Sequence, residues 1–375
     1  MMWTKRLLLV LTLFAAALTV QANDTPLLIE FNSRDGALSA GVSASGTVVG
    51  NLATGGAFYW MPTTGTIFIG GYQGMDVSLD GRTIVGIARD TRGIQQAGIW
   101  VRAAEWQLLG APRPDAVPCL DFLSGAAGTS DDGRVIVGWA NVATSESNAC
   151  ASANSHAFRW EASTGMTDLG SSVPGQSSQA KGVSGDGRVV VGSQRSSTGL
   201  PQGARWVDGR QELIPAATAL PGGFVGTAHA ANRDGSVVVG ETCRLLATSY
   251  LDFQAAWIWT ASGGTQCLPA PMAIVPEGPN SPPVVVRALA TSLDGHVVVG
   301  EQGIGATDTE AVIWIDRTAY YLKDYLRANG VPDAFQRWIK TGSLSDVTPD
   351  GRILVGNGSP IGGPNGYIVI LGGQP

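Results

Sequence analysis

The sequence predicts an all-β fold, a seven-bladed β-propeller of four-stranded blades, from one repeated phrase and its spacing. The phrase is Ser, any residue, Asp, Gly, a polar residue, an aliphatic run and a final Gly. Copies lie about 51 residues apart on average, which is the period of four-stranded blades rather than of helical repeats. Seven copies of the phrase occur, some complete, some nearly complete and one degenerate. They are Ser78–Gly86, Ser130–Gly138, Ser184–Gly192, Ser292–Gly300, Asn232–Gly240, Thr348–Gly356 and the degenerate Ser43–Gly50.

Each copy predicts two strands joined by a tight turn. Asp-Gly between apolar stretches favours a two-residue hairpin turn in which both central residues take positive φ. Uninterrupted Val runs suit a strand that is buried on both faces, as an inner blade strand is. An aromatic residue in the next strand is expected to fill the space between neighbouring blades, and it recurs as Trp60, Trp100, Trp160, Trp206, Trp259 and Trp314.

The repeat predicts a single propeller domain over residues 23–375. We expect blades at approximately 37–70, 75–110, 127–170, 179–214, 228–268, 287–322 and 343–371. The last unit ends after three strands, and Leu27–Phe31 stands alone before the first unit. Because unpaired strand edges at a seam are unstable, we expect 27–31 to close the ring by completing the last blade. Residues 322–340 are expected to form a helical insertion in two short pieces, around Leu322–Leu326 and Ala334–Trp338, packed on the ring as a cap.

The N-terminus predicts export. Lys5 and Arg6 precede an apolar run over 7–20, and Ala22 provides a small residue for cleavage, so 1–22 reads as a signal peptide. We expect a periplasmic or extracellular protein with no membrane insertion after cleavage. The net charge of −6 and the absence of a Lys/Arg cluster argue against a nucleic-acid partner.

Long connections are expected on one face of the propeller. In a blade, the turns after the first and third strands lie on one face, and the remaining connections lie on the other. The long segments all belong to the second set, and we call this side the long-loop face. It is the expected working surface, and it receives Ala111–Gly125, Asn141–Ser155, Pro215–Thr227, Thr242–Gln254, Ala270–Pro283 and Lys323–Gly342.

Four cysteines in an exported chain predict two disulfides, for which three connectivities exist. The propeller register favours Cys119 with Cys150 and Cys243 with Cys267, because each pair belongs to one blade and to the long-loop face. No CxxC pair or His cluster supplies a zinc site, and the repeated Asp residues are too sparse for calcium. Neither a metal nor a cofactor is expected.

The string His156-Ala157-Phe158-Arg159-Trp160, followed by Asp168-Leu169-Gly170, resembles the HAF-repeat family of probable extracellular repeat proteins. The repeated phrase is similar to the rest of that repeat, and the resemblance covers essentially the whole chain after the leader. It implies a bacterial exported protein and implies no reaction.

No nucleophile, base and orienting group can be assembled from the sequence. The position after the final Gly of the phrase is expected to end the second strand near the long-loop face and the central channel. Trp139, Glu241 and Glu301 occupy it and are the candidate ligand-binding residues.

Two function classes remain open. The favoured one is a non-catalytic propeller that binds a protein or glycan ligand on the long-loop face. The alternative is a carbohydrate-active propeller enzyme, a glycoside hydrolase or lyase, in which Glu241 and Glu301 act as paired carboxylates.

Overall fold

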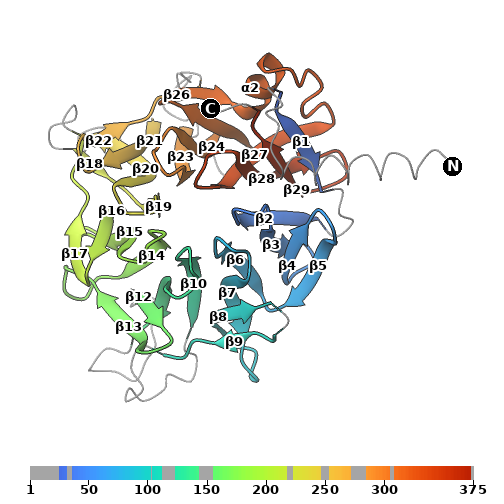
Figure 1. Cartoon of the computed structure of the whole chain (residues 1–375). Coiled ribbons are helices and arrows are strands. Elements are labelled where there is room, and N and C mark those ends of the chain that lie inside the picture. Colours follow the sequence, from blue (N-terminus) through green and yellow to red (C-terminus); the bar gives the residue numbers. More distant parts are fainter. Residues whose placement is uncertain are drawn as a thin grey trace.

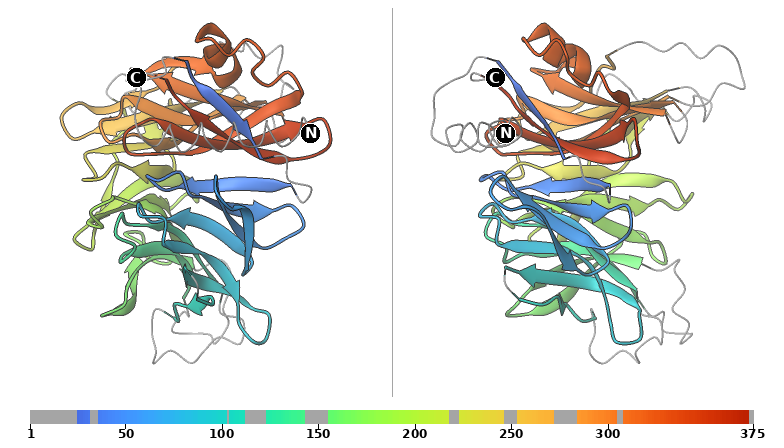
Figure 2. Two further views of the ribbon diagram at one scale, coloured as in Figure 1. Left: turned by 45° about the vertical axis from the view of Figure 1, so that its right-hand side comes forward. Right: turned by 90° about the vertical axis from the view of Figure 1, so that its right-hand side faces the viewer.

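The protein is an all-β propeller, as the sequence predicts. The computed structural model describes residues 25–31, 36–102, 104–111, 123–142, 155–217, 223–245, 253–271, 284–304 and 308–372. The sheets are arranged around a common centre (Figure 1), and Figure 2 shows them fanned about it in side view. Among these residues no helix has the length and apolar character needed to span a membrane. The predicted signal peptide, residues 1–22, lies outside them.

Five sheets have four strands each. The first two contain β2 (Ala37–Val42), β3 (Val48–Leu52), β4 (Ala57–Met61) and β5 (Gly65–Gly70), then β6 (Gln73–Val77), β7 (Thr83–Arg89), β8 (Gln95–Val101) and β9 (Gln107–Leu108). The next two contain β10 (Ser124–Thr129), β11 (Ile136–Asn141), β12 (Ser155–Glu161) and β13 (Gly165–Gly170), then β14 (Ser178–Val183), β15 (Val189–Arg195), β16 (Pro201–Val207) and β17 (Arg210–Leu213). The fifth contains β27 (Trp338–Val347), β28 (Ile353–Pro360), β29 (Asn365–Ile370) and β1 (Leu27–Glu30).

Two repeat units share one nine-stranded sheet. It contains β18 (Gly223–Val225), β19 (Ala228–Ala231), β20 (Val237–Leu245), β21 (Phe253–Thr260), β22 (Gly264–Cys267), β23 (Val284–Thr291), β24 (Val297–Ile304), β25 (Asp308–Ile315) and β26 (Thr318–Tyr321). The units join where Glu241 on β20 pairs with Arg287 on β23, and where β21 runs briefly parallel to β23. This junction lies beside the candidate site described below.

The first strand of each repeat unit lies nearest the centre in Figure 1 and carries a bulge. The bulge always faces the final Gly of the repeated phrase, because the ladder skips one residue there in every unit. A Cβ on Gly86 would lie 1.9 Å from the Gln73 carbonyl oxygen, and a Cβ on Gly50 equally close to that of Leu38. Only glycine fits at this close backbone approach.

The turn after each first strand differs from the predicted two-residue hairpin. Gly81 has φ of 74°, but Asp80 keeps a negative φ, and the Ser78 N–H bonds to the Thr83 carbonyl across a four-residue connection. The Ser78 hydroxyl accepts the Thr83 N–H and donates to Asp80, which also accepts the Arg82 N–H. This network, which the sequence reasoning missed, holds Asp80 in the ordinary φ region and lowers its pKa, mainly through the Ser78 hydroxyl. The turn-forming role of the repeated Asp is confirmed.

Hydrophobic clusters lie between neighbouring sheets. The aliphatic run of the second strand is fully buried, as at Val190 and Val191. Trp206 packs with Val137 and Ala157 of the preceding sheet, and Trp314 packs with Val239 of the preceding repeat unit in the nine-stranded sheet. The prediction that the repeated aromatic residue fills the space between units is confirmed.

The strand β1 pairs with β29 in antiparallel register, from Leu27 opposite Ile370 to Glu30 opposite Tyr367. Phe31, just after it, is buried in a cluster with Phe58 of the first sheet and Ile368 of the last sheet. The Glu30 carboxylate accepts a 2.8 Å hydrogen bond from the Trp338 indole. The N-terminal segment therefore joins the sheet that contains the C-terminal strands.

The segment 322–340 is helical only in its first part. The helix α2 (Leu322–Ala328) ends at Asn329, and its Leu322 and Leu326 are fully buried. The predicted second helical piece is wrong, because residues 332–337 form turns and Phe335 has φ of 57°. Phe335 still packs against Tyr367 in the core, so the segment covers the ring as expected.

Candidate functional site

A polar pocket with a volume of about 760 Å³ is lined by residues from Ser155, at the start of β12, to Arg287 on β23. Its lining comes from strand ends, such as Ser178 at the start of β14 and Gln194 near the end of β15, and it includes Thr227 just before β19 and Glu241 within β20. These strand ends lie on the long-loop face. Much of the long connections predicted for this face, including 112–122, 143–154, 246–252 and 272–283, falls outside the described residues.

Two carboxylates and a guanidinium form a row across three adjacent strands. Arg287 on β23 stands opposite Glu241 on one side and Glu301 on the other. Its Nε donates to Glu241 at 2.6 Å, and its Nη1 donates to Glu301 at 2.5 Å. Both carboxylates therefore hold one guanidinium in place, and part of its N–H donors stays unused.

The two predicted acidic residues are thus brought together, but through a cation. Burial alone would raise the pKa of Glu241, yet the neighbouring His229 and Arg287 outweigh it and lower that pKa to about 2. The His229 Nε2 lies 3.6 Å from the Glu241 carboxylate. A carboxyl with so low a pKa is ionised at neutral pH, so Glu241 does not fit the general-acid role of a paired-carboxylate mechanism.

Lys181 enters the same pocket from the inner strand β14. It is half-buried, and within the described part of the chain its ammonium has no hydrogen bond or ion pair. Burial lowers its pKa, although the charge of Glu241 acts in the opposite direction. An ammonium group that has no partner and lies in a pocket is well suited to bind an anionic group of a ligand.

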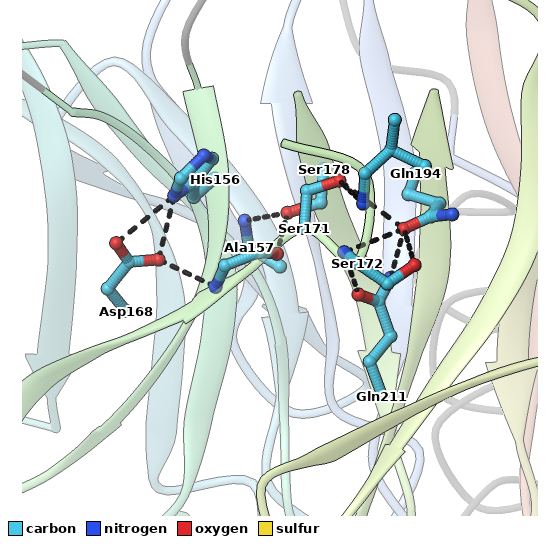
Figure 3. A network of polar contacts seen from close by, with 10 residues as sticks. His156, Ala157, Asp168, Ser171, Ser172, Ser178, Gln194 and Gln211 are labelled. Atoms are coloured by element: carbon cyan, nitrogen blue, oxygen red, sulfur yellow. Dashed lines mark hydrogen bonds and ion pairs between the residues drawn. The ribbon is translucent and has the colours of Figure 1, made fainter. Parts of the chain in front are cut away.

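Gln194 is the second group with an unused donor (Figure 3). Its Oε1 accepts from the Ser172 N–H at 3.0 Å, the Ser172 hydroxyl at 2.8 Å and the Gln211 amide at 2.9 Å, with Ser171 slightly further away. Because the Ser172 N–H can only donate, the amide orientation is fixed. The Nε2 of this side chain, which is 1% exposed, is left without a partner.

Trp139 does not line this pocket. It lies on β11, and its indole nitrogen would be 2.9 Å from a Cβ placed on Gly125 in the neighbouring strand. Trp139 therefore covers a glycine of its own sheet. Of the three candidate residues, the structure brings Glu241 and Glu301 together and leaves Trp139 apart.

Three pocket residues were missed as site residues. Lys181 and His229 occupy the third position before the Ser or Asn of the repeated phrase, and Arg287 the fifth. Equivalent third positions in other units hold small or apolar residues, such as Ala40, Met75, Ala127 and Leu289. A comparison of the units along their first strands would have marked Lys181 and His229 as departures from the pattern.

The central channel is a second cavity, of about 210 Å³, lined by the inner strands. Asp76 and Asp346 both face it. The Asp346 carboxylate accepts the Val42 N–H and the Asp76 carboxylate accepts the Thr129 N–H, each at 2.8 Å and each from the following sheet. These carboxylates therefore satisfy backbone donors between units. The described residues contain no group of three or more His, Cys, Asp or Glu side chains able to hold a metal ion.

We expect the channel carboxylates to make the fold less stable as the pH rises from about 4 toward neutrality. Burial raises the pKa of Asp76 and Asp346, and the charge of Asp76 raises that of Asp346 further. The folded chain thus keeps protons that the unfolded chain has released, so deprotonation favours unfolding. Melting temperatures measured in steps over this range should fall, and Asp346→Asn should flatten the slope. A melting temperature that rises steadily over the range would contradict this assignment.

The disulfide Cys243–Cys267 is present, with a Cα–Cα distance of 5.7 Å. It ties the end of β20, two residues beyond Glu241, to the end of β22. The other predicted pair, Cys119 with Cys150, lies outside the described residues.

Peptide mapping of the unreduced protein should recover Cys243 linked to Cys267, because the strands hold their Cα atoms within disulfide reach. The same digest should link Cys119 to Cys150 if the predicted register of the third unit is right. Recovery of Cys119 joined to Cys243 or Cys267 would show that register to be wrong.

Comparisons with known proteins bear on the fold. No protein-family model and no curated protein matches the chain. An oligogalacturonate lyase from Vibrio parahaemolyticus is similar in structure at 10% identity and TM-score 0.52, over 94% of this chain and 95% of that one. A putative TolB from Agrobacterium tumefaciens has 14% identity and TM-score 0.41, over 66% and 89%. The β-propeller domain of the Trilobed protease from Pyrococcus furiosus has 13% identity and TM-score 0.42, over 76% and 78%.

Proposed function

We propose that the protein is an exported binding propeller of seven blades that holds a ligand in the pocket of Lys181, His229, Glu241 and Arg287 and does not transform it. Two blades correspond to the nine-stranded sheet, since it contains two repeat units. Pairing of β1 with β29 supports ring closure by the N-terminal strand. The leader and the disulfide support a periplasmic or extracellular location, and the resemblance to HAF repeats agrees with it.

The unused donors of the pocket carry this proposal. Among the described residues, the Lys181 ammonium has no hydrogen bond or ion pair, the Gln194 Nε2 has no acceptor, and Arg287 uses two of its five N–H donors. Buried polar groups are normally paired, so a set of unpaired donors around one cavity indicates an incoming ligand. The described residues provide no nucleophile activated by a neighbouring base at this place.

A carbohydrate-active lyase is the second candidate. The observation in its favour is Lys181, whose pKa is lowered by burial. A lysine of lowered pKa would suit abstraction of a proton from a substrate whose own carboxylate is neutralised by Arg287. The lyase among the similar structures acts on an oligogalacturonate by its name, but that likeness concerns the fold alone.

A glycan array probed with the exported protein, with Arg287→Ala and with Arg134→Ala tests where the ligand binds. Arg287→Ala should abolish binding, because it removes the guanidinium and leaves two carboxylates facing the ligand. Arg134→Ala is the control, since Arg134 is 86% exposed on a turn of the opposite face. Equal binding by all three proteins would place the ligand elsewhere.

A further inference from the structure

The pocket is donor-rich and carries a local excess of positive charge. Lys181, Arg195 and Arg287 line it or its rim, whereas Glu241 and Glu301 are the two carboxylates that face this set. Without counting His229, three cations meet two anions, so the pocket carries an excess of positive charge. The whole chain has a net charge of −6, so this excess is a local feature.

The polar groups are fixed before a ligand arrives. Arg287 is held from two sides by Glu241 and Glu301. Hydrogen bonds to the Oε1 of Gln194 hold this side chain, so the direction in which its unpaired Nε2 can donate is fixed. Donors that are already ordered lose little entropy on binding, which favours an acceptor-bearing ligand over water.

The rest of the lining indicates the kind of molecule that brings the acceptors. It consists mainly of hydroxyl and amide side chains, such as Ser177, Ser178, Gln179 and Ser193, and among the described residues it contains no Phe, Tyr or Trp. Such walls match a ligand covered with hydroxyl groups. A peptide would need apolar recesses for its side chains, and within the described part of the chain Pro201 is the one apolar side chain of any size in the lining.

We propose that the ligand is a sugar acid, whose single carboxylate binds between Lys181 and Arg287 while its hydroxyl groups meet Gln194 and the serines. This identification rests on the proposed function, because it names the ligand class of the same pocket. The carboxylate of such a ligand complements the local excess of positive charge. A free sugar acid and the residues of an acidic polysaccharide share this chemistry.

Calorimetric titration of the exported protein tests the charge requirement without any variant. The probes are D-glucuronate, D-mannuronate and D-galacturonate, each against its neutral hexose, together with inorganic phosphate. At least one acid should bind at least tenfold more tightly than its hexose, and its affinity should fall as salt is added. A tetramer of the same acid distinguishes the source, since tighter binding of the tetramer indicates a polysaccharide.

Two variants assign the charge to Lys181. Lys181→Met keeps the length of the side chain without its charge and should weaken binding of the acid at least tenfold, whereas Lys181→Arg should preserve most of it. Arg134→Ala is again the control, and melting temperatures establish that each variant is folded.

The results that would contradict the sugar-acid inference differ from those that would contradict the binding function. If neutral hexoses bind as tightly as the acids and Arg287→Ala abolishes both, the sugar-acid inference is wrong and the binding function remains. Tighter binding of phosphate than of every acid also overturns the inference. If no sugar, acid or array glycan binds, both the inference and the proposed function are wrong.

Discussion

Deletion of Leu27–Phe31 should lower the melting temperature of the entire protein by on the order of 10 °C. The deletion exposes the edge of β29 and removes Phe31 from the cluster between the first and last sheets. Burial of a Phe or Ile side chain stabilises a fold by about 1.5–3 kcal/mol, and both Ile29 and Phe31 pack there. Thermal unfolding followed by circular dichroism measures the effect.

The matched control for this deletion is Leu27→Ser. Leu27 pairs with Ile370 through its backbone and its side chain is 41% exposed, so the substitution should change stability by less than about 0.5 kcal/mol. An unchanged transition after the deletion would show that β1 does not hold the ring together.

Gly86→Ala should destabilise the protein by about 3 kcal/mol or more, because the new methyl group would meet backbone and not a movable side chain. Its Cβ would lie 1.9 Å from the Gln73 carbonyl oxygen, and the bulge at Gly74 and Asp76 leaves no room for a shift. Chemical denaturation of the variant measures the loss.

Gly98→Ala in the same sheet is the control. The nearest atoms to its Cβ would be side-chain atoms of Trp106 and Ala88, at 3.1 and 3.2 Å, and we expect a change below about 1 kcal/mol. If Gly86→Ala is no worse than Gly98→Ala, the close strand approach does not explain the final Gly of the repeat.

The sequence predicts the scaffold well because the scaffold depends on local and repeated chemistry. The aliphatic run becomes the buried second strand in every unit, and the repeated aromatic residue packs between units. The predictions of local structure were wrong where a side-chain contact changes the backbone conformation that the sequence pattern favours. The Ser78 hydroxyl turns an expected two-residue hairpin into a four-residue connection, and Phe335 leaves helical φ to reach the core.

The candidate site was predicted only in part, because it depends on which strand ends meet across units. Glu241 and Glu301 were identified from their common place after the final Gly. The guanidinium between them comes from the first half of β23, which lies before the repeated phrase. Lys181 and His229 lie on the inner strands β14 and β19, at positions where other units have small or apolar residues.

The central claim is that the pocket binds a ligand and returns it unchanged. The most direct measurement is mass spectrometry of ligand eluted from the exported protein after prolonged incubation, using a glycan that the protein retains. We predict that its mass is unaltered, as it is after incubation with Glu241→Ala combined with Glu301→Ala. Shortened or unsaturated product from the parent protein, absent from that double variant although the variant still binds the glycan, would contradict the claim.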